Sequence, residues 1–241
     1  MTAIDTSTTI GQLVAQRPSR ARVFERLGID YCCGGKTPLG TACAERGLDA
    51  ETVMGALHDE DASGATGSER DWAQATLTDL AEHIVATHHA YLRRELPRLA
   101  ALTTRVHQVH GARHAELAQV REVFDGLSGE LSAHMQKEEF ILFRLIAQME
   151  AAQAAKPSHC GTLRNPIRVM EMEHDSAGNA LAELRRLTSD YTPPADACGS
   201  YRALLSGLAE LEADLHQHIH KENNILFPRA VQLESRLNAG L

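Results

Sequence analysis

Two copies of one motif hold the residues of this chain that are best suited to chemistry. The first copy reads His134-Met-Gln-Lys-Glu138 and the second reads His218-Ile-His-Lys-Glu222, and both continue as x-x-Ile-Leu-Phe. Residues four apart lie on one face of an α-helix, so the imidazole and the carboxylate of each copy point the same way. Because both groups are metal ligands, the duplication predicts two halves of a two-metal site.

Both motifs lie on an apolar stripe whose members are three and four residues apart. Its members are Val120, Phe124, Leu127, Leu131 and Ile141 around the first copy, and Leu204, Leu208, Leu211, Leu215 and Ile225 around the second. This period predicts two buried helical faces. A buried carboxylate without a partner costs several kcal/mol. The alternative, four ordinary buried groups that are each hydrogen-bonded to a neighbour, needs a separate explanation for each of them, and we expect ligands instead.

Two further helices are predicted, each with one histidine in register with its apolar stripe. These are the segments 77–102, with His89, and 167–187, with His174. We expect each to pair with a motif helix as a hairpin, with turns at residues 106–114 and at Thr192-Pro-Pro194. Two such hairpins related by a pseudo-two-fold axis form an up-down-up-down four-helix bundle. The six expected ligands are then His89, His134, Glu138, His174, His218 and Glu222.

The other histidines do not share this register. His89 is in phase with the stripe of its helix, whereas the adjacent His88 is in phase only with Ile84. His216 and His220 lie about 200° around the helix from His218 and are excluded as ligands. We expect the remaining histidines to be mostly solvated, with His83 alone near enough to His89 to touch a ligand; they are His58, His83, His107, His110, His114 and His159.

Four imidazoles and two carboxylates suit two first-row metal ions that share Glu138 and Glu222 as bridges. The absence of thiolates on the stripes argues against a structural zinc centre, and mixed imidazole and carboxylate ligands are typical of non-haem iron. Ligand type alone leaves manganese and zinc open. Iron with open coordination positions predicts small-molecule or electron chemistry, and whether the protein turns over a substrate stays open.

Composition favours a cytoplasmic protein. The 241 residues contain 24 Lys and Arg against 32 Asp and Glu, a net charge of −8 without a basic cluster, so we expect no nucleic-acid partner. Residues 1–20 lack a secretory apolar core, and no apolar run has membrane-spanning length. Five cysteines without framework spacing fit a reducing compartment. The sequence leaves a monomer and a homodimer open.

Low aromatic content and the lack of alternating β-branched stretches predict an all-α protein. The acidic, small-residue-rich stretch that begins at Asp59 predicts a linker. We therefore expect a small helical domain over 1–58, a linker over 59–75 and the bundle over 76–238. The first domain is predicted to hold four short helices, the second opened by Pro18-Ser19 and the fourth capped by Asp49.

Cys32 and Cys33 stand between these short helices and precede Gly34 and Gly35. Adjacent cysteines cannot close an easy disulfide, because the ring between them distorts the peptide bond. Two interpretations stay open: small buried residues in a turn, or a thiol pair for redox exchange or transient metal transfer. Cys43, Cys160 and Cys198 look isolated, and we expect them to be inert.

These motifs together resemble the repair-of-iron-centres family, hemerythrin-like di-iron proteins with an additional N-terminal domain of the ScdA type. The resemblance covers nearly the whole chain and rests on the segments 30–36 (Asp-Tyr-Cys-Cys-Gly-Gly-Lys), 134–139 (His-Met-Gln-Lys-Glu-Glu), 171–175 (Glu-Met-Glu-His-Asp) and 222–228 (Glu-Asn-Asn-Ile-Leu-Phe-Pro). Arg144 stands where the second copy has Pro228, and the loop 156–164 looks long, but neither departure touches the ligands.

The resemblance implies repair of iron–sulfur clusters damaged by nitric oxide or oxidants. It implies the same six ligands, a di-iron centre with oxo and carboxylate bridges, and proteins with damaged clusters as partners. Iron donation and chemistry with nitric oxide or oxygen at the two irons are both compatible with it. The main alternative is a hemerythrin-type carrier or sensor of oxygen or nitric oxide, although such proteins usually use more histidines. A di-iron oxygenase would use more carboxylates.

Overall fold

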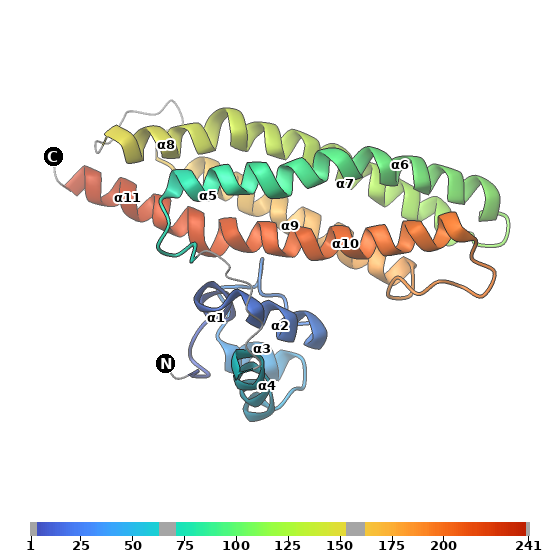
Figure 1. The fold of residues 1–241 in the computed structure, drawn as a ribbon, viewed down its shortest axis with the longest axis horizontal. Helices are drawn as coiled ribbons and strands as arrows, with labels where there is room; N and C mark the ends of the chain where they lie inside the picture. Colours follow the sequence, from blue (N-terminus) through green and yellow to red (C-terminus); the bar gives the residue numbers. More distant parts are fainter. Residues whose placement is uncertain (1–3, 63–70, 153–161, 240–241) are drawn as a thin grey trace. The chain divides into compact units, whose positions relative to one another are not determined.

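The computed structural model describes residues 4–62, 71–152 and 162–239, and within these ranges every regular element is a helix (Figure 1). The predicted all-α class is thereby confirmed. The chain divides into two compact units, residues 1–80 with 216–241 and residues 81–215. His159 and Cys160, expected to be solvated and inert, lie outside the described residues.

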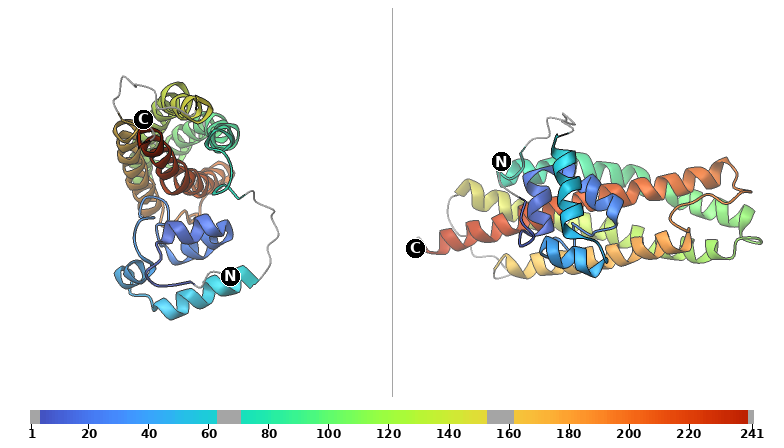
Figure 2. Two further views of the ribbon diagram at one scale, coloured as in Figure 1. Left: turned by 90° about the vertical axis from the view of Figure 1, so that its left-hand side faces the viewer. Right: turned by 90° about the horizontal axis from the view of Figure 1, so that it is seen from below.

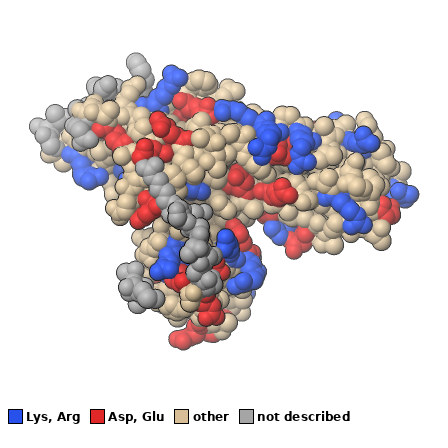
Figure 3. Space-filling view, in the orientation of Figure 1, with Lys and Arg blue, Asp and Glu red and all other residues tan. Residues whose placement is uncertain are grey.

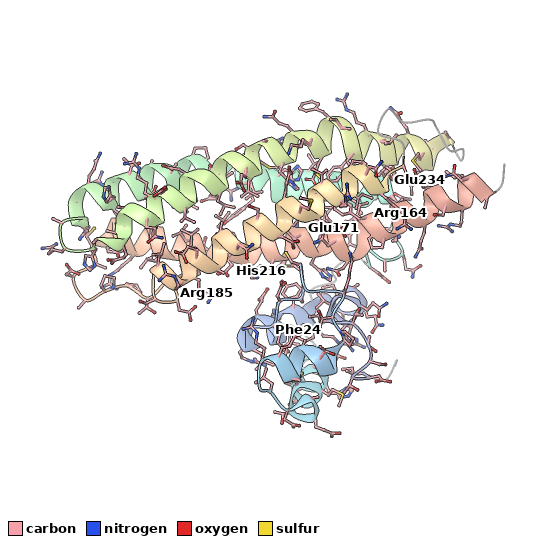
Figure 4. The ribbon with its side chains drawn as sticks, turned by 180° about the vertical axis from the view of Figure 1, so that it is seen from behind. Phe24, Arg164, Glu171, Arg185, His216 and Glu234 are labelled. Atoms are coloured by element: carbon pink, nitrogen blue, oxygen red, sulfur yellow. The ribbon has the colours of Figure 1, made fainter. Side chains whose placement is uncertain are left out.

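The first unit begins with short helices, namely α1 (Ile10–Gln16), a 3-10 turn (Pro18–Arg20), α2 (Ala21–Leu27), α3 (Leu39–Glu45) and α4 (Ala50–Ala62). Pro18 opens the turn and the Asp49 carboxylate accepts the backbone N–H of Thr52 at 2.9 Å, as the sequence predicts. Phe24, labelled in Figure 4, is completely buried among these helices. Apolar burial therefore holds the short helices together.

Helix α4 extends farther than the sequence analysis expected. The predicted linker starts at residue 59, but α4 continues to Ala62. The reason is an ion pair inside the unit: the Arg20 guanidinium donates to both oxygens of Asp61 at 3.1 and 2.7 Å, and both side chains are about 5% exposed. A paired guanidinium and carboxylate keep the last turn of α4 folded against the first helices.

The same unit contains the C-terminal segment, with a π-helical turn (Glu222–Leu226) followed by α11 (Phe227–Ala239). The Asn224 side-chain amide donates to the carbonyl oxygens of Cys32 and Tyr31 at 3.0 and 3.4 Å. A Cβ atom on Gly11 or Gly35 would lie 2.3 or 2.2 Å from the Asn224 Oδ1 atom. The N-terminal helices thus contact the C-terminal segment closely because two glycines leave room for Asn224.

The second unit contains the helices α6 (Ala90–His110), α7 (Glu116–Lys137), α8 (Phe143–Ala152) and α9 (Arg164–Leu187). It also contains residues 81–84 of α5 (Leu77–Ile84) and the part of α10 (Gly199–Lys221) that ends at Leu215. Helix α7 lies beside α6 on one side and α9 on the other (Figure 2). Hydrogen bonds between α7 and α9 join His134 to Glu173 and Gln119 to Glu183, so these two helices are antiparallel.

The core of this unit contains the apolar residues that the sequence stripes predicted. Val120, Phe124, Leu127 and Leu131 of α7 share one buried cluster with Leu204, Leu208, Leu211 and Leu215 of α10 and with residues of α6 and α9. The hairpin bounds differ slightly from expectation: α6 ends at His110 rather than near Val106, and α7 begins at Glu116 rather than near His114. The period of the pattern was therefore more informative than its ends.

Charges of both signs lie on the face of the molecule that Figure 3 shows. Figure 3 shows Lys and Arg interspersed with Asp and Glu along the long helices. In the described ranges, no helix combines the length and apolar character needed to span a membrane.

Replacing Gly11 with Ala should weaken the contact between the N-terminal helices and the C-terminal segment. Its Cβ atom would meet the Gly35 carbonyl oxygen at 2.8 Å as well as the Asn224 side chain, so backbone has to move. We expect faster amide hydrogen exchange at residues 10–14 and 30–37. Gly55→Ala is the control, because open space surrounds that position on α4 and alanine is about 1 kcal/mol more favourable than glycine inside a helix. Equal exchange in both variants would contradict this account.

Candidate metal centre

Each helix that carries a predicted carboxylate ligand widens into a π-helical turn at that residue. The turn Glu138–Leu142 begins at Glu138, and the turn Glu222–Leu226 begins at Glu222. A third turn, Val85–His89, ends at His89. Single π-turns are rare and concentrate at functional sites, because they re-aim side chains inside a helix. The duplication seen in the sequence therefore extends to the backbone.

The π-turn corrects one prediction of the sequence analysis. Ile141 was expected to continue the buried stripe, but it is 53% exposed, whereas Leu142 is 2% exposed. A π-turn contains one more residue per turn than an α-helix, so the inward position moves from three to four residues after Glu138. Val85, at the start of the third π-turn, is likewise only half-buried. Helical periodicity alone cannot reveal such a turn.

Four of the predicted ligands meet in the core of the second unit. The Nε2 atoms of His89 and His134 each lie 3.3 Å from the same Oε2 atom of Glu138. The Nε2 atom of His174 lies 3.1 Å from that of His134. These side chains come from the π-turn Val85–His89, α7, the π-turn Glu138–Leu142 and α9, and none is more than 3% exposed.

The other two predicted ligands form a pair in the first unit. The Nε2 atom of His218, at the end of α10, lies 2.9 Å from Oε1 of Glu222, one turn further on. Both residues are at most 1% exposed. This pair repeats the spacing and burial of His134 and Glu138.

Two carboxylates that the sequence analysis missed hold the outer side of the imidazoles. Glu139 accepts a hydrogen bond from Nδ1 of His89 at 2.6 Å, and Glu173 accepts one from Nδ1 of His134 at 2.8 Å. A proton held on Nδ1 leaves the Nε2 lone pair free for a metal, and ligand histidines in proteins are typically oriented in this way.

Each outer carboxylate is itself neutralised by a cation. Arg93 donates to both oxygens of Glu139 at 2.6 and 2.7 Å, and Lys137 pairs with Glu173. Burial alone would raise the pKa of Glu139, but Arg93 and His89 outweigh burial and lower it. The pKa of Glu173 is lowered in the same way by Lys137 and His134. Both carboxylates are therefore charged at neutral pH and able to accept the Nδ1 protons.

The histidines that the sequence excluded have other contacts. Nδ1 of the buried His88 lies 2.9 Å from Asp214, away from Glu138. His220 is also buried, with its ring centroid 5.5 Å from that of Tyr31, and burial lowers its pKa to about 4. His110 was expected to be solvated but is 3% exposed, because the end of α6 is packed against Cys198 and Tyr201. The spacing could not show these burials because each depends on a distant segment.

The cysteine pair lies in a turn organised by one carboxylate. Asp30 accepts the backbone N–H groups of Cys32, Cys33 and Gly34, each at 3.0 Å. The two sulfur atoms are 3.9 Å apart, and ligand atoms of Asp30, Cys32 and Cys33 lie within 4.8 Å of one another. The hydrogen bond to Cys33, burial and the nearby Asp30 raise the pKa of Cys32 well above its usual value. Its thiol is therefore protonated at neutral pH unless a metal displaces the proton.

The donor atoms of the second unit fit a cation. Ligand atoms of His134, Glu138 and His174 lie within 4.8 Å of one another. Two imidazole Nε2 atoms that face each other at 3.1 Å cannot both act as donors, and a shared cation satisfies both lone pairs. Nitrogen and carboxylate donors without thiolates suit a first-row transition metal. Fold and site together define a helical-bundle protein with a buried cluster of side chains able to hold a cation.

Comparisons with known proteins agree with this class. The Hemerythrin HHE cation binding domain matches residues 80–230, and the ScdA_N domain, a domain of unknown function, matches residues 6–61. A "Probable iron-sulfur cluster repair protein" of Haemophilus influenzae is 38% identical over 226 residues, 92% of this chain and 96% of that protein.

Proteins named "Iron-sulfur cluster repair protein YtfE" are similarly close. The one from Musicola paradisiaca is 39% identical and covers 94% of this chain and 97% of its own, and the one from Edwardsiella ictaluri is 40% identical and covers 92% and 96%. The chain belongs to the repair-of-iron-centres family of hemerythrin-like proteins, as its motifs predicted. The names of these relatives do not favour the alternative of an oxygen carrier.

His89→Ala should cost metal, whereas His88→Ala should largely retain it. The reason is that His89 faces Glu138, while His88 faces Asp214. Metal content per chain after gel filtration, measured by elemental analysis, distinguishes the two, and thermal unfolding shows whether either variant is merely destabilised. Loss of metal from the His88 variant alone would mean that His88 is the ligand, on a face about 100° around the helix from His89, and would refute the assignment.

Proposed function

We propose that this protein repairs damaged iron–sulfur clusters and holds two non-haem irons in one carboxylate-bridged centre. The observation that carries the proposal is the duplicated His-x-x-x-Glu motif, with each buried Glu opening a π-turn. The proposed ligands are His89, His134, Glu138, His174, His218 and Glu222. Hemerythrin-like membership supports iron as the cation.

The register of the helices supports a single centre. His88, in the π-turn before α6, contacts Asp214 of α10, and His110 at the end of α6 contacts Cys198 just before α10, so α10 is antiparallel to α6. A short turn makes α7 antiparallel to α6 as well, and α7 and α10 therefore run in the same direction.

Leu131 of α7 and Leu215 of α10 belong to one core cluster. Each precedes a motif histidine by three residues on its own helix. If both helices continue for one further turn in the same direction, about 5 Å, we expect both motif pairs at the same level.

Within this centre we assign one histidine from each hairpin to each iron. One iron position would take His89, Glu138, His218 and Glu222, and the other would take His134, Glu138, His174 and Glu222. Both glutamates would then help to hold both irons, and the irons would supply the chemistry with small molecules. The positions of the histidines inside the second unit support this assignment. His134 faces His174, whereas His89 approaches Glu138 from another helix.

The residues of the protein bind, orient and protect. Glu139 and Glu173 hold the two imidazoles in the Nε2-ligating tautomer, and Arg93 and Lys137 keep those carboxylates charged. Complete burial of Glu138 and Glu222 keeps bulk water from competing for the bridges. When bound, the irons supply redox chemistry and sites for nitric oxide or oxygen.

Repair is the activity named for relatives that cover nearly all of this chain. We propose that its partners are proteins with damaged iron–sulfur clusters and that it donates iron to them. The proposed domains are 1–58, extended by α4 to residue 62, and a bundle over 76–238. We further propose that Asp30, Cys32 and Cys33 form a transient iron acceptor on the route out, because their ligand atoms lie within 4.8 Å of one another.

The central test is iron stoichiometry combined with repair. We expect about two irons per chain, and we expect iron-loaded protein to restore activity to an iron–sulfur dehydratase inactivated by nitric oxide. Glu138→Ala or Glu222→Ala should remove a bridge and at least half of the iron. Glu122→Ala, an exposed position on α7, is the matched control. One tightly held zinc per chain, or repair that is independent of bound iron, would refute the proposal.

The thiols require a separate test. A Cys32→Ala, Cys33→Ala double variant should keep both irons and their optical spectrum, because the thiols are not among the six ligands. It should hand iron to the damaged dehydratase more slowly than the parent protein. Unchanged transfer would make the pair a structural turn, and loss of the di-iron spectrum would make a thiol part of the centre itself.

A further inference from the structure

A cysteine and a buried histidine meet where α6 ends and α10 begins. Nε2 of His110 lies 3.2 Å from Sγ of Cys198, and the His110 ring is 3% exposed while Cys198 is exposed. The Tyr201 ring packs against His110, with 5.3 Å between ring centroids. Cys198 was expected to be isolated and inert, and this contact contradicts the expected isolation.

The buried side of His110 decides its tautomer. Its Nδ1 atom is inaccessible to solvent and has no hydrogen-bond partner among the described residues. An unsatisfied buried N–H costs more than an unsatisfied lone pair, so we infer the tautomer with its proton on Nε2. Nε2–H then donates to the Cys198 sulfur, and a donor stabilises a thiolate more strongly than a thiol.

The N-terminus of α10 also favours negative charge on the sulfur of Cys198. The Cys198 carbonyl oxygen accepts the Arg202 N–H at 3.0 Å, which makes Cys198 the residue that caps this 23-residue helix. The N-terminus of a long helix carries a partial positive charge from its free N–H groups. Cysteines at helix N-termini and beside histidines are the ones that react as nucleophiles in proteins.

We propose that Cys198 is a peroxide-reactive thiol activated by His110, separate from the metal centre. His110 is 21 residues beyond His89 on one helix, a distance of about 30 Å at 1.5 Å per residue. The Cys198 thiolate attacks one oxygen of hydrogen peroxide, so that an S–O bond forms and the O–O bond breaks. Sulfur is oxidised by two electrons to a sulfenic acid, and the departing hydroxide takes a proton from solvent to become water.

The same corner of the bundle contains a matched control. His114 is one turn away and is held by carboxylates, with Nε2 3.0 Å from Asp196 and Nδ1 3.1 Å from Glu116. The hydrogen bond to Asp196, and that to Glu116, raise the pKa of His114. No contact joins His114 to the Cys198 sulfur among the described residues. Its removal changes local charge and packing without removing the donor to sulfur.

The test is the alkylation rate of Cys198 by iodoacetamide in the full chain at pH 7, followed by peptide mass spectrometry. An ordinary thiol is only a few per cent thiolate at that pH, so activation can raise the rate by up to about thirtyfold. We expect His110→Leu to slow the reaction about tenfold and His114→Leu to change it less than twofold. Equal rates in the parent protein and the His110 variant would overturn the proposal.

Two further measurements keep the test decisive if the His110 variant is unstable. Cys198 in the folded parent chain should react about tenfold faster than in the same chain unfolded in urea; a folded rate equal to or below the unfolded rate contradicts activation. After a brief pulse of hydrogen peroxide, dimedone should trap a sulfenic acid on the Cys198 peptide, and Cys198→Ser should abolish that adduct. Trapping only at other cysteines would also overturn the proposal.

Discussion

Burial of charged and imidazole groups in a helical core is the constraint on which the rest of this structure depends. Glu138 is completely buried and is approached by two imidazole nitrogens at 3.3 Å. A carboxylate in such surroundings destabilises the fold unless cations or donors compensate it. Apolar residues on the inner faces of the long helices supply the burial, and the imidazoles and the proposed irons supply the compensation. Folding and metal binding are in this sense one problem.

The π-turns direct the buried carboxylates toward the core. An α-helix presents a face every third or fourth residue, which alone would leave Glu138 in line with Ile141. Widening the helix at Glu138 and at Glu222 turns the carboxylate inward and lets Leu142 and Leu226 close the core behind it. The two copies share this distortion, so the duplication preserved a backbone irregularity as well as a motif.

Support for the ligands continues outward through alternating charges. His89 is held by Glu139 and then Arg93, and His134 is held by Glu173 and then Lys137. Each chain of contacts ends on a partly exposed cation, which neutralises the carboxylate that supports the imidazole. A separate thiol and imidazole pair at the far end of α6 uses a buried ring in a different way, to fix a donor at sulfur.

The sequence by itself determined the all-α class, the stripes of the bundle and a candidate ligand set, because helical periodicity and a duplicated motif are local properties of the chain. It also indicated the family through short motifs such as Asp30 to Lys36. Only the tertiary structure revealed Glu139 and Glu173 as supports, Ile141 as exposed, and His110 beside Cys198. These features depend on contacts between residues far apart in sequence and on a π-turn that shifts the register. A period read along one helix contains neither kind of information, since packing against other segments decides both.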